Sequence, residues 1–85
     1  MWLGTWGAGR IVVAMLTAAD GQAVEAAVAE GRQFDEHARW GVAMTLRKLR
    51  DNAEHDYPPA WSLADGLCRA WAARWGEERP QPATR

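Results

Sequence analysis

Two histidines and a single cysteine are the side chains of this sequence best suited to metal binding, proton transfer or nucleophilic attack. His37 lies in the segment Asp-Glu-His at 35–37, and His55 lies in Glu-His-Asp at 54–56. Each histidine thus has carboxylates beside it, a setting in which an imidazole could ligate a metal ion. The two segments stand at opposite ends of one expected helix, about 27 Å apart along its axis. We therefore do not expect them to share a metal ion within one chain.

Cys68 and a glycine-rich stretch are the other candidates for chemistry. No base is spaced to activate Cys68 on its own helix, and its place on an apolar stripe favours a buried, inert thiol. The stretch GTWGAG at 4–9 has the composition of a phosphate-binding loop. It precedes a candidate strand instead of following one, so the required helix N-terminus is missing. We therefore expect no catalytic residue, no metal site, no cofactor and no enzymatic activity.

Charge and cysteine content narrow the class of partner and the compartment. The 85 residues include 10 Lys and Arg against 11 Asp and Glu, a net charge of -1. This balance removes the simplest argument for a nucleic acid or an acidic membrane as partner. Cys68 has no second cysteine to pair with, so a reducing cytoplasm is the expected location. The bias toward arginine and alanine is typical of a GC-rich bacterial or phage genome.

The N-terminal segment is apolar but too short to cross a membrane. Its uninterrupted apolar run is Ile11 to Ala19, about half of the roughly 18 residues that a span needs. Arg10 would lie inside any longer span, at a cost of about 2.5 to 3.5 kcal/mol. We expect no membrane partner.

Helix start and stop signals predict three helices, at about 18–31, 36–54 and 62–75. Hydroxyl and carboxylate residues suited to the N-terminal caps precede each helix, and glycines or prolines suited to termination follow. These signals are Thr17 with Asp20, Asp35, and Ser62 with Asp65 at the starts, and Gly31, Pro58 with Pro59, and Gly76 at the ends. The first and last helices share these start and stop signals. We favour convergence on common helix chemistry as the reason, and a duplication is the alternative.

The residues before the first helix are expected to form a short strand or extended segment at about 10–16. This stretch is rich in β-branched residues and follows two glycines, although such a run can also be a buried helical turn. The fold class is therefore mainly α, with a single helical domain at 1–76. The polar, proline-bearing tail at 77–85 is expected to be disordered.

Helical periodicity assigns the core faces of the last two helices. On the last helix a broad arc of about 140° is apolar, with Leu63, Leu67 and Trp71 facing the middle and Trp61 and Trp75 at the edge. On the middle helix a narrower core stripe comprises Ala38, Val42, Leu46, Leu49 and Ala53.

Trp40 and Met44 lie one turn apart on the other side of the middle helix. Arg47 and Lys48 flank them, so the group has the aromatic, methionine and basic make-up that is enriched in interface cores. The alternative is that Trp40 lies flat on its own helix or under the N-terminal segment. We predict that Trp40, Met44, Arg47, Lys48 and Trp75 bind a protein partner.

The number of tryptophans supports an interface. Six tryptophans, at about 150 to 250 Å² each, are more aromatic surface than three short helices are expected to bury. The first helix offers only small residues on its best face (Val24, Ala27, Val28 and Gly31), against which large side chains from elsewhere or from a second subunit would pack. A homodimer or a stable complex is therefore expected.

A nucleic-acid regulator is the alternative function. It would use a face of Arg39, Arg47, Lys48 and Arg50. The roughly eight residues between the second and third helices are too many for the turn of a helix-turn-helix motif. Arg74 points toward the apolar arc, which favours a snorkelling side chain or an inter-chain ion pair with Glu77 or Glu78. We therefore favour a small non-enzymatic protein-protein interaction module: an adaptor, accessory subunit or inhibitor.

Overall fold

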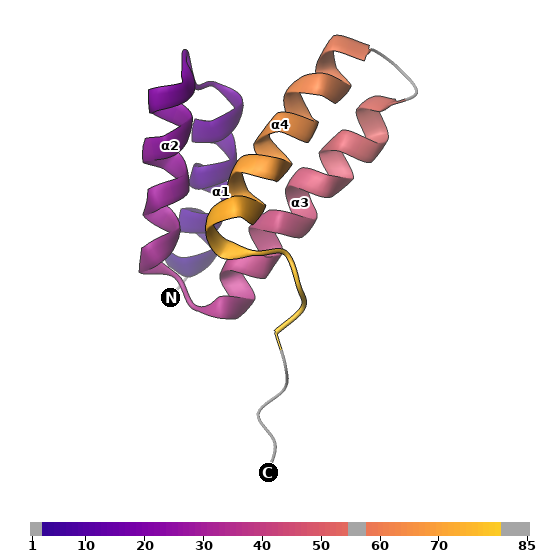
Figure 1. Cartoon of the computed structure of the whole chain (residues 1–85). Coiled ribbons are helices and arrows are strands. Elements are labelled where there is room, and N and C mark those ends of the chain that lie inside the picture. The colour runs from indigo at the N-terminus through magenta and orange to yellow at the C-terminus, as the bar shows by residue number, and fades with distance from the viewer. Residues whose placement is uncertain (1–2, 55–57, 81–85) are drawn as a thin grey trace.

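The computed structural model describes residues 3–54 and 58–80 of the chain, with side chains described for 7–53 and 58–80. Four α-helices make up almost all of this part: α1 (Leu3–Leu16), α2 (Gly21–Ala29), α3 (Glu36–Glu54) and α4 (Pro58–Trp75) (Figure 1). A single 3-10 turn, η1 (Glu30–Gln33), extends α2. The described residues contain no strand, which confirms the mainly α fold class.

The N-terminal segment is a helix, so the strand expected at about 10–16 is wrong. In a strand, Ile11, Val13 and Met15 would share one face. In the structure Ile11 and Met15 are buried, at 5% and 1% exposure, whereas Val13 is 58% exposed. This is the pattern of residues four apart on a helix. The β-branched composition is overridden because α1 buries one side against the other helices.

The first helix caps differ from the expected ones. Asp20, and not Thr17, is the N-cap of α2, where its carboxylate accepts a hydrogen bond from the amide of Ala23 (2.8 Å). The Thr17 hydroxyl instead donates to the carbonyl oxygen of Val13 at the end of α1 (2.8 Å). Thr17 therefore belongs to the C-terminal end of α1, a helix that the sequence did not predict.

Most of the boundaries expected for α3 and α4 are confirmed. Asp35 caps α3 by accepting from the amide of Ala38 (2.8 Å), and α3 ends at Glu54 before the two prolines. The helix α4 begins at Pro58 and not at Ser62, because proline is well tolerated in the first turn of a helix. Gly76 has the expected left-handed conformation, with φ of 77°.

Gly31 does not close a helix with a left-handed residue, as its sequence position suggested. Among the described residues only Gly76 has a positive φ, and Gly31 is buried within η1. A Cβ atom at Gly31 would lie 2.6 Å from Nε1 of Trp75 and 2.9 Å from the ring of Trp71. The glycine is therefore required by close approach, and the small-residue face of α2 receives large side chains from its own chain.

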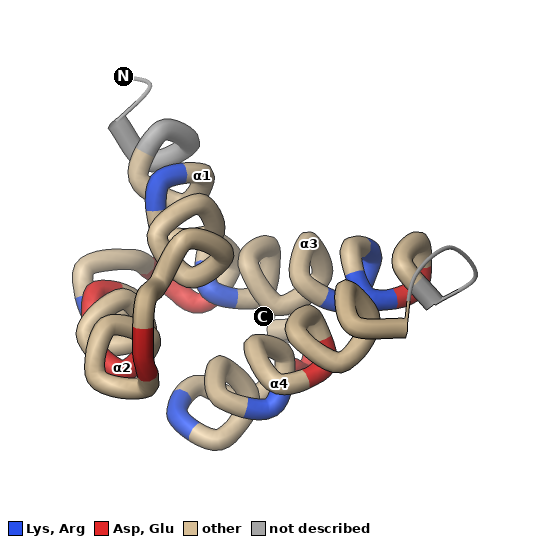
Figure 2. The backbone as a smooth tube through the Cα atoms, turned by 90° about the horizontal axis from the view of Figure 1, so that it is seen from above, with Lys and Arg blue, Asp and Glu red and all other residues tan. Residues whose placement is uncertain are grey.

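The helices form an antiparallel pair, α3 and α4, against whose lower half α1 and α2 pack (Figures 1 and 2). The buried core lies at this junction and comprises Ile11, Met15, Ala27, Val28, Val42, Ala43, Leu46, Leu67, Cys68 and Trp71. No described residue after Leu46 in α3 or before Ala64 in α4 is buried. The far end of the pair, which leans away from α1 and α2 in both views, is thus only two helices thick.

This arrangement decides which expected core residues are buried. Leu67 and Trp71 are buried as expected, at 4% and 0% exposure. Leu63 is 52% exposed, so its expected place in the middle is wrong. It lies toward the far end of the pair, before the first buried residue of α4. On α3 the expected core stripe is buried or half-buried throughout.

Two indole groups of α4 join the helices together. Nε1 of Trp71 donates a hydrogen bond to the carbonyl oxygen of Arg39 (3.0 Å), and Nε1 of Trp75 donates to that of Val28 (2.8 Å). The two ring centroids are 6.3 Å apart, with a tilt of 50° between the planes. Trp71 thus ties α4 to α3, and Trp75 ties α4 to α2.

Within the described part of the chain, no helix is both long enough and apolar enough to cross a membrane.

The contact at Gly31 can be tested by substitution. Gly31→Ala is expected to destabilise the protein by about 1 to 3 kcal/mol, since the new methyl group overlaps both indoles. Gly66→Ala is the matched control, because its Cβ meets nothing within 4 Å and alanine is favoured over glycine in a helix by about 1 kcal/mol. Urea unfolding should move the two midpoints in opposite directions. Equal midpoints would contradict the close packing.

The burial of Trp71 makes a second test. Trp71→Ala is expected to cost about 3 to 5 kcal/mol, which is a large share of the stability of a small domain. Trp40→Ala should cost much less, because Trp40 is only half-buried and lies outside the core cluster. Urea midpoints that rank the two variants in the reverse order would show that the core is misassigned.

Candidate functional site

The structure brings two of the predicted partner-binding residues, Trp40 and Trp75, to one end of the α3–α4 pair. There the start of α3 lies beside the end of α4 (Figure 1). Both indoles are half-buried, as is Met44 one turn further along α3. Arg47 and Lys48 follow on α3, where both are exposed.

Two arginines stack on the indole of Trp75. The guanidinium carbon of Arg39 lies 4.7 Å from the ring centroid, and that of Arg74 lies 4.5 Å from it. Arg39 also donates to the carbonyl oxygens of Gly31 (3.1 Å) and Phe34 (2.6 Å). Its charge is therefore engaged at the end of η1, whereas Arg74 has no hydrogen bond to another described residue beyond this stacking.

A third arginine comes from the segment after α4. The guanidinium carbon of Arg79 lies 5.6 Å from the centroid of the Trp40 ring. Residues 77–80 belong to the tail expected to be disordered, and they carry neither helix nor strand; residues 81–85 lie outside the described part. We call Arg39, Trp40, Arg74, Trp75 and Arg79 the Arg/Trp surface.

A depression of about 340 Å³ opens between these elements. Its lining joins the start of α3, the end of α4 and the segment that follows: Glu36, Arg39, Arg74, Trp75, Glu78, Arg79 and Pro80. Trp75 lines it directly, whereas Trp40 does not line it and contacts only the lining residue Arg79 among the three arginines. The depression is thus predominantly polar, with three guanidinium groups and two carboxylates around an aromatic wall.

The sequence did not indicate this grouping of arginines. Arg74 was expected to snorkel or to pair with a second chain; in the structure it lies over the indole of its neighbour Trp75. The adjacency of arginine and tryptophan at 74–75 was the one available signal. Arg79 had none, because its position depends on the path of the chain after Gly76.

Two of the four cations proposed for a nucleic-acid face are engaged within the protein. Arg39 is held by carbonyl groups and Trp75, as described. Nη1 of Arg50 contacts Asp65 (3.1 Å) across the α3–α4 interface, and this hydrogen bond is the main cause that raises the pKa of Arg50. Arg69 also pairs with Asp65 (3.0 Å). Only Arg47 and Lys48 of the proposed four remain exposed.

The burial of the indoles weakens the argument from tryptophan number. Trp71 is fully buried, and Trp40, Trp61 and Trp75 are half-buried. No described indole is fully exposed, while Trp2 and the side chain of Trp6 lie outside the described part. The fold shelters more of this aromatic surface than expected, because Gly31 leaves room for two rings. A role in binding must therefore be argued from the arrangement of the surface.

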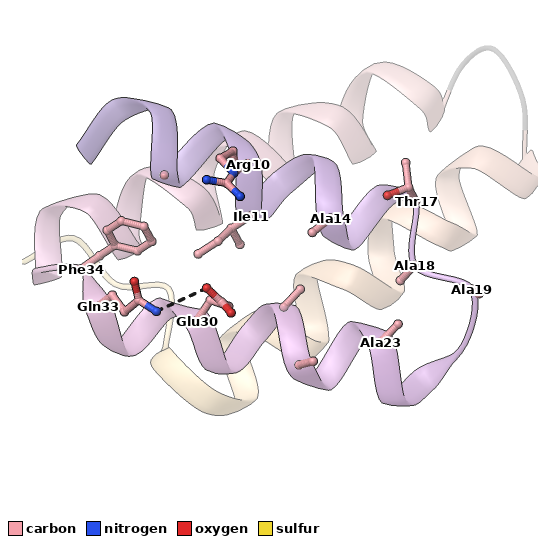
Figure 3. Close-up of a pocket in the computed structure, with 13 residues that line it drawn as sticks. Arg10, Ile11, Ala14, Thr17, Ala18, Ala19, Ala23, Glu30, Gln33 and Phe34 are labelled. Carbon is pink, nitrogen blue, oxygen red and sulfur yellow. Dashed lines mark hydrogen bonds between the residues drawn. The ribbon is translucent and has the colours of Figure 1, made fainter. Parts of the chain in front are cut away.

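A larger groove of about 580 Å³ runs between α1 and α2 (Figure 3). Alanine is the commonest residue in its walls, and the polar residues Arg10, Glu30 and Gln33 also line it. The Gln33 amide donates to the Glu30 carboxylate (3.4 Å). These polar groups are exposed, so the groove lacks the buried, convergent polar atoms that mark a specific small-molecule site.

Of the residues first considered for chemistry, those that the structure describes are not assembled into a site. His37 is exposed in the first turn of α3, and His55 lies outside the described residues. The stretch GTWGAG forms part of α1 and is no loop. Among the residues that the structure describes, no three His, Cys, Asp or Glu side chains are grouped to hold a metal ion.

Cys68 is buried in the core, and this burial raises the pKa of its thiol above the ordinary value. At a given pH the folded protein therefore contains less thiolate than the unfolded chain. Alkylation by iodoacetamide at mildly alkaline pH is expected to be at least about tenfold slower in the native protein than in urea, since only the thiolate attacks. Glutathione in the same two solutions controls for the effect of urea. Equal rates for Cys68 would contradict its burial.

This end of the molecule combines half-buried aromatic rings with cations and two carboxylates. Comparisons of the chain with protein-family models, with curated proteins and with solved structures found no match.

Proposed function

We propose that this protein is a small non-enzymatic interaction module that docks on another protein through the end of the α3–α4 pair. The observation that supports the proposal is the gathering of Trp40 and Trp75, both half-buried, with three guanidinium groups on one surface. Tryptophan and arginine are the residues most enriched among those that dominate binding energy in interfaces.

In this mechanism Trp40 and Met44 are the apolar anchors. Their remaining exposed surface would be covered by the partner, while Met44 packs against the core and Trp40 is half-buried beside it. Arg47 and Lys48, further along α3 and exposed, would contribute to orientation and to the rate of encounter more than to affinity. Docking by a rigid helical surface is sufficient for an adaptor, an accessory subunit or an inhibitor, which act by bridging or occlusion.

Homodimerisation and residence in the cytoplasm belong to the proposal as well. The free, buried thiol of Cys68 is compatible with a reducing compartment. A nucleic-acid regulator is less favoured, since Arg39 and Arg50 of its proposed face are engaged inside the protein. Light scattering of the pure protein measures the oligomeric state directly.

Affinity capture from the native host tests the docking role. Trp40→Ala is expected to reduce recovery of a specific protein at least about tenfold, as a loss of about 1.4 kcal/mol or more at an anchor residue would do. Trp61→Ala is the matched control, because Trp61 is also half-buried but lies at the opposite end of α4.

Circular dichroism should show both variants folded. A capture profile that is unchanged by Trp40→Ala would contradict this surface as the docking site. A mobility shift of arbitrary duplex DNA would favour the nucleic-acid function instead, if the shift weakens with salt and is lost in the double variant Arg47→Gln/Lys48→Gln.

A further inference from the structure

The guanidinium groups of Arg74 and Arg79 contact indole rings, and their N–H groups form no hydrogen bond to another described residue. Each guanidinium carbon lies over an indole ring, at 4.5 Å for Arg74 on Trp75 and 5.6 Å for Arg79 on Trp40. Both side chains are exposed. Neither forms an ion pair with any residue that the structure describes, although Glu36 and Glu78 line the same depression.

Stacking of this kind prepares an arginine for one type of ligand. A cation–π contact attracts the charge to the face of the ring and uses none of the five N–H donors of the guanidinium group. Both side chains are exposed, so these donors are accessible, and two of them match the two oxygens of a carboxylate. Arg39 differs, because two carbonyl oxygens already accept from its Nη1. Arg74 and Arg79 are thus the arginines of this surface with free edges.

The electrostatics of the depression favour a carboxylate guest. Two guanidinium groups lie over the ring of Trp75, and a third lies over the ring of Trp40. Three positive charges are thus gathered here, and none of them forms an ion pair with a described carboxylate. An added carboxylate between Arg74 and Arg79 would relieve this repulsion in a setting shielded on one side by indole.

We propose that the depression binds the carboxylates of an acidic segment of the partner protein, with Arg74 and Arg79 as the residues that grip them. This inference rests on the proposed docking function and names the chemistry of the partner. A volume of about 340 Å³ suits a few side chains of an extended segment. The two lining glutamates oppose a nucleic-acid backbone with its continuous phosphates more strongly than a peptide whose carboxylates are spaced apart.

A direct binding measurement tests the inference. The probe is a fluorescein-labelled peptide in which glutamate alternates with glycine and leucine, and its control has glutamine at every glutamate position. Fluorescence anisotropy with the full-length chain at low salt is expected to show at least about tenfold tighter binding of the acidic peptide, because hydrogen bonds between charged groups are the stronger ones.

Substitutions assign the binding to the two arginines. Arg74→Gln and Arg79→Gln are each expected to weaken binding of the acidic peptide about tenfold, and Arg74→Lys to restore only part of the loss, since lysine keeps the charge but not the planar fork. Arg69→Gln is the matched control. Arg69 is an exposed arginine of α4 that pairs with Asp65 and does not line the depression.

Three results would overturn the inference: equal binding of the two peptides, no loss in Arg74→Gln and Arg79→Gln, or tighter binding of duplex DNA that depends on the same arginines. Failure here is distinguishable from failure of the docking function. If Trp40→Ala still abolishes capture of the native partner while the acidic peptide does not bind, docking stands and the carboxylate chemistry is wrong.

Discussion

The seating of the Trp71 and Trp75 rings against Gly31 is the contact on which the rest of the structure depends. Each indole donates its one hydrogen bond to a backbone carbonyl of a different helix, Arg39 in α3 and Val28 in α2. An unpaired indole N–H inside the core would be costly, so these bonds allow two large rings to be placed there. The absence of a side chain at Gly31 allows α2, α3 and α4 to meet at one point.

The same contact builds the candidate surface. Because Trp75 is fixed to α2 through its nitrogen, its ring faces stay available to cations, and Arg39 and Arg74 both use them. The side chain of Trp75 therefore belongs both to the packing of the helices and to the candidate surface. The far end of the α3–α4 pair has no such arrangement, and there Leu63 is left 52% exposed.

The sequence was most informative where short-range chemistry decides the outcome. Asp35, the two prolines and Gly76 act on their immediate neighbours, so the bounds of α3 and the end of α4 could be predicted. The nature of α1 could not, because β-branched residues favour a strand locally and only packing of Ile11 and Met15 makes the helix preferable. The exposure of Leu63 likewise depends on how far α1 and α2 reach along the pair, which no local pattern contains.

The candidate surface could be predicted only in part, for the same reason. Trp40, Met44 and Trp75 were identified from helical periodicity, which places residues on faces. The Arg/Trp surface requires Arg39, Arg74 and Arg79 to converge from two helices and a segment without regular structure. That convergence depends on tertiary geometry. In the sequence, only the adjacency of Arg74 and Trp75 indicates one of these contacts.

The Arg/Trp surface depends on Gly76, a residue that is not part of it. A side chain there would meet nothing within 4 Å, yet the backbone holds φ of 77°, a conformation that costs other residues about 1 to 2 kcal/mol. This one dihedral angle sets the direction in which the chain leaves α4 and so decides whether Arg79 reaches Trp40. The make-up of the candidate surface thus depends on rotation about a single bond, at a residue whose own contacts are few.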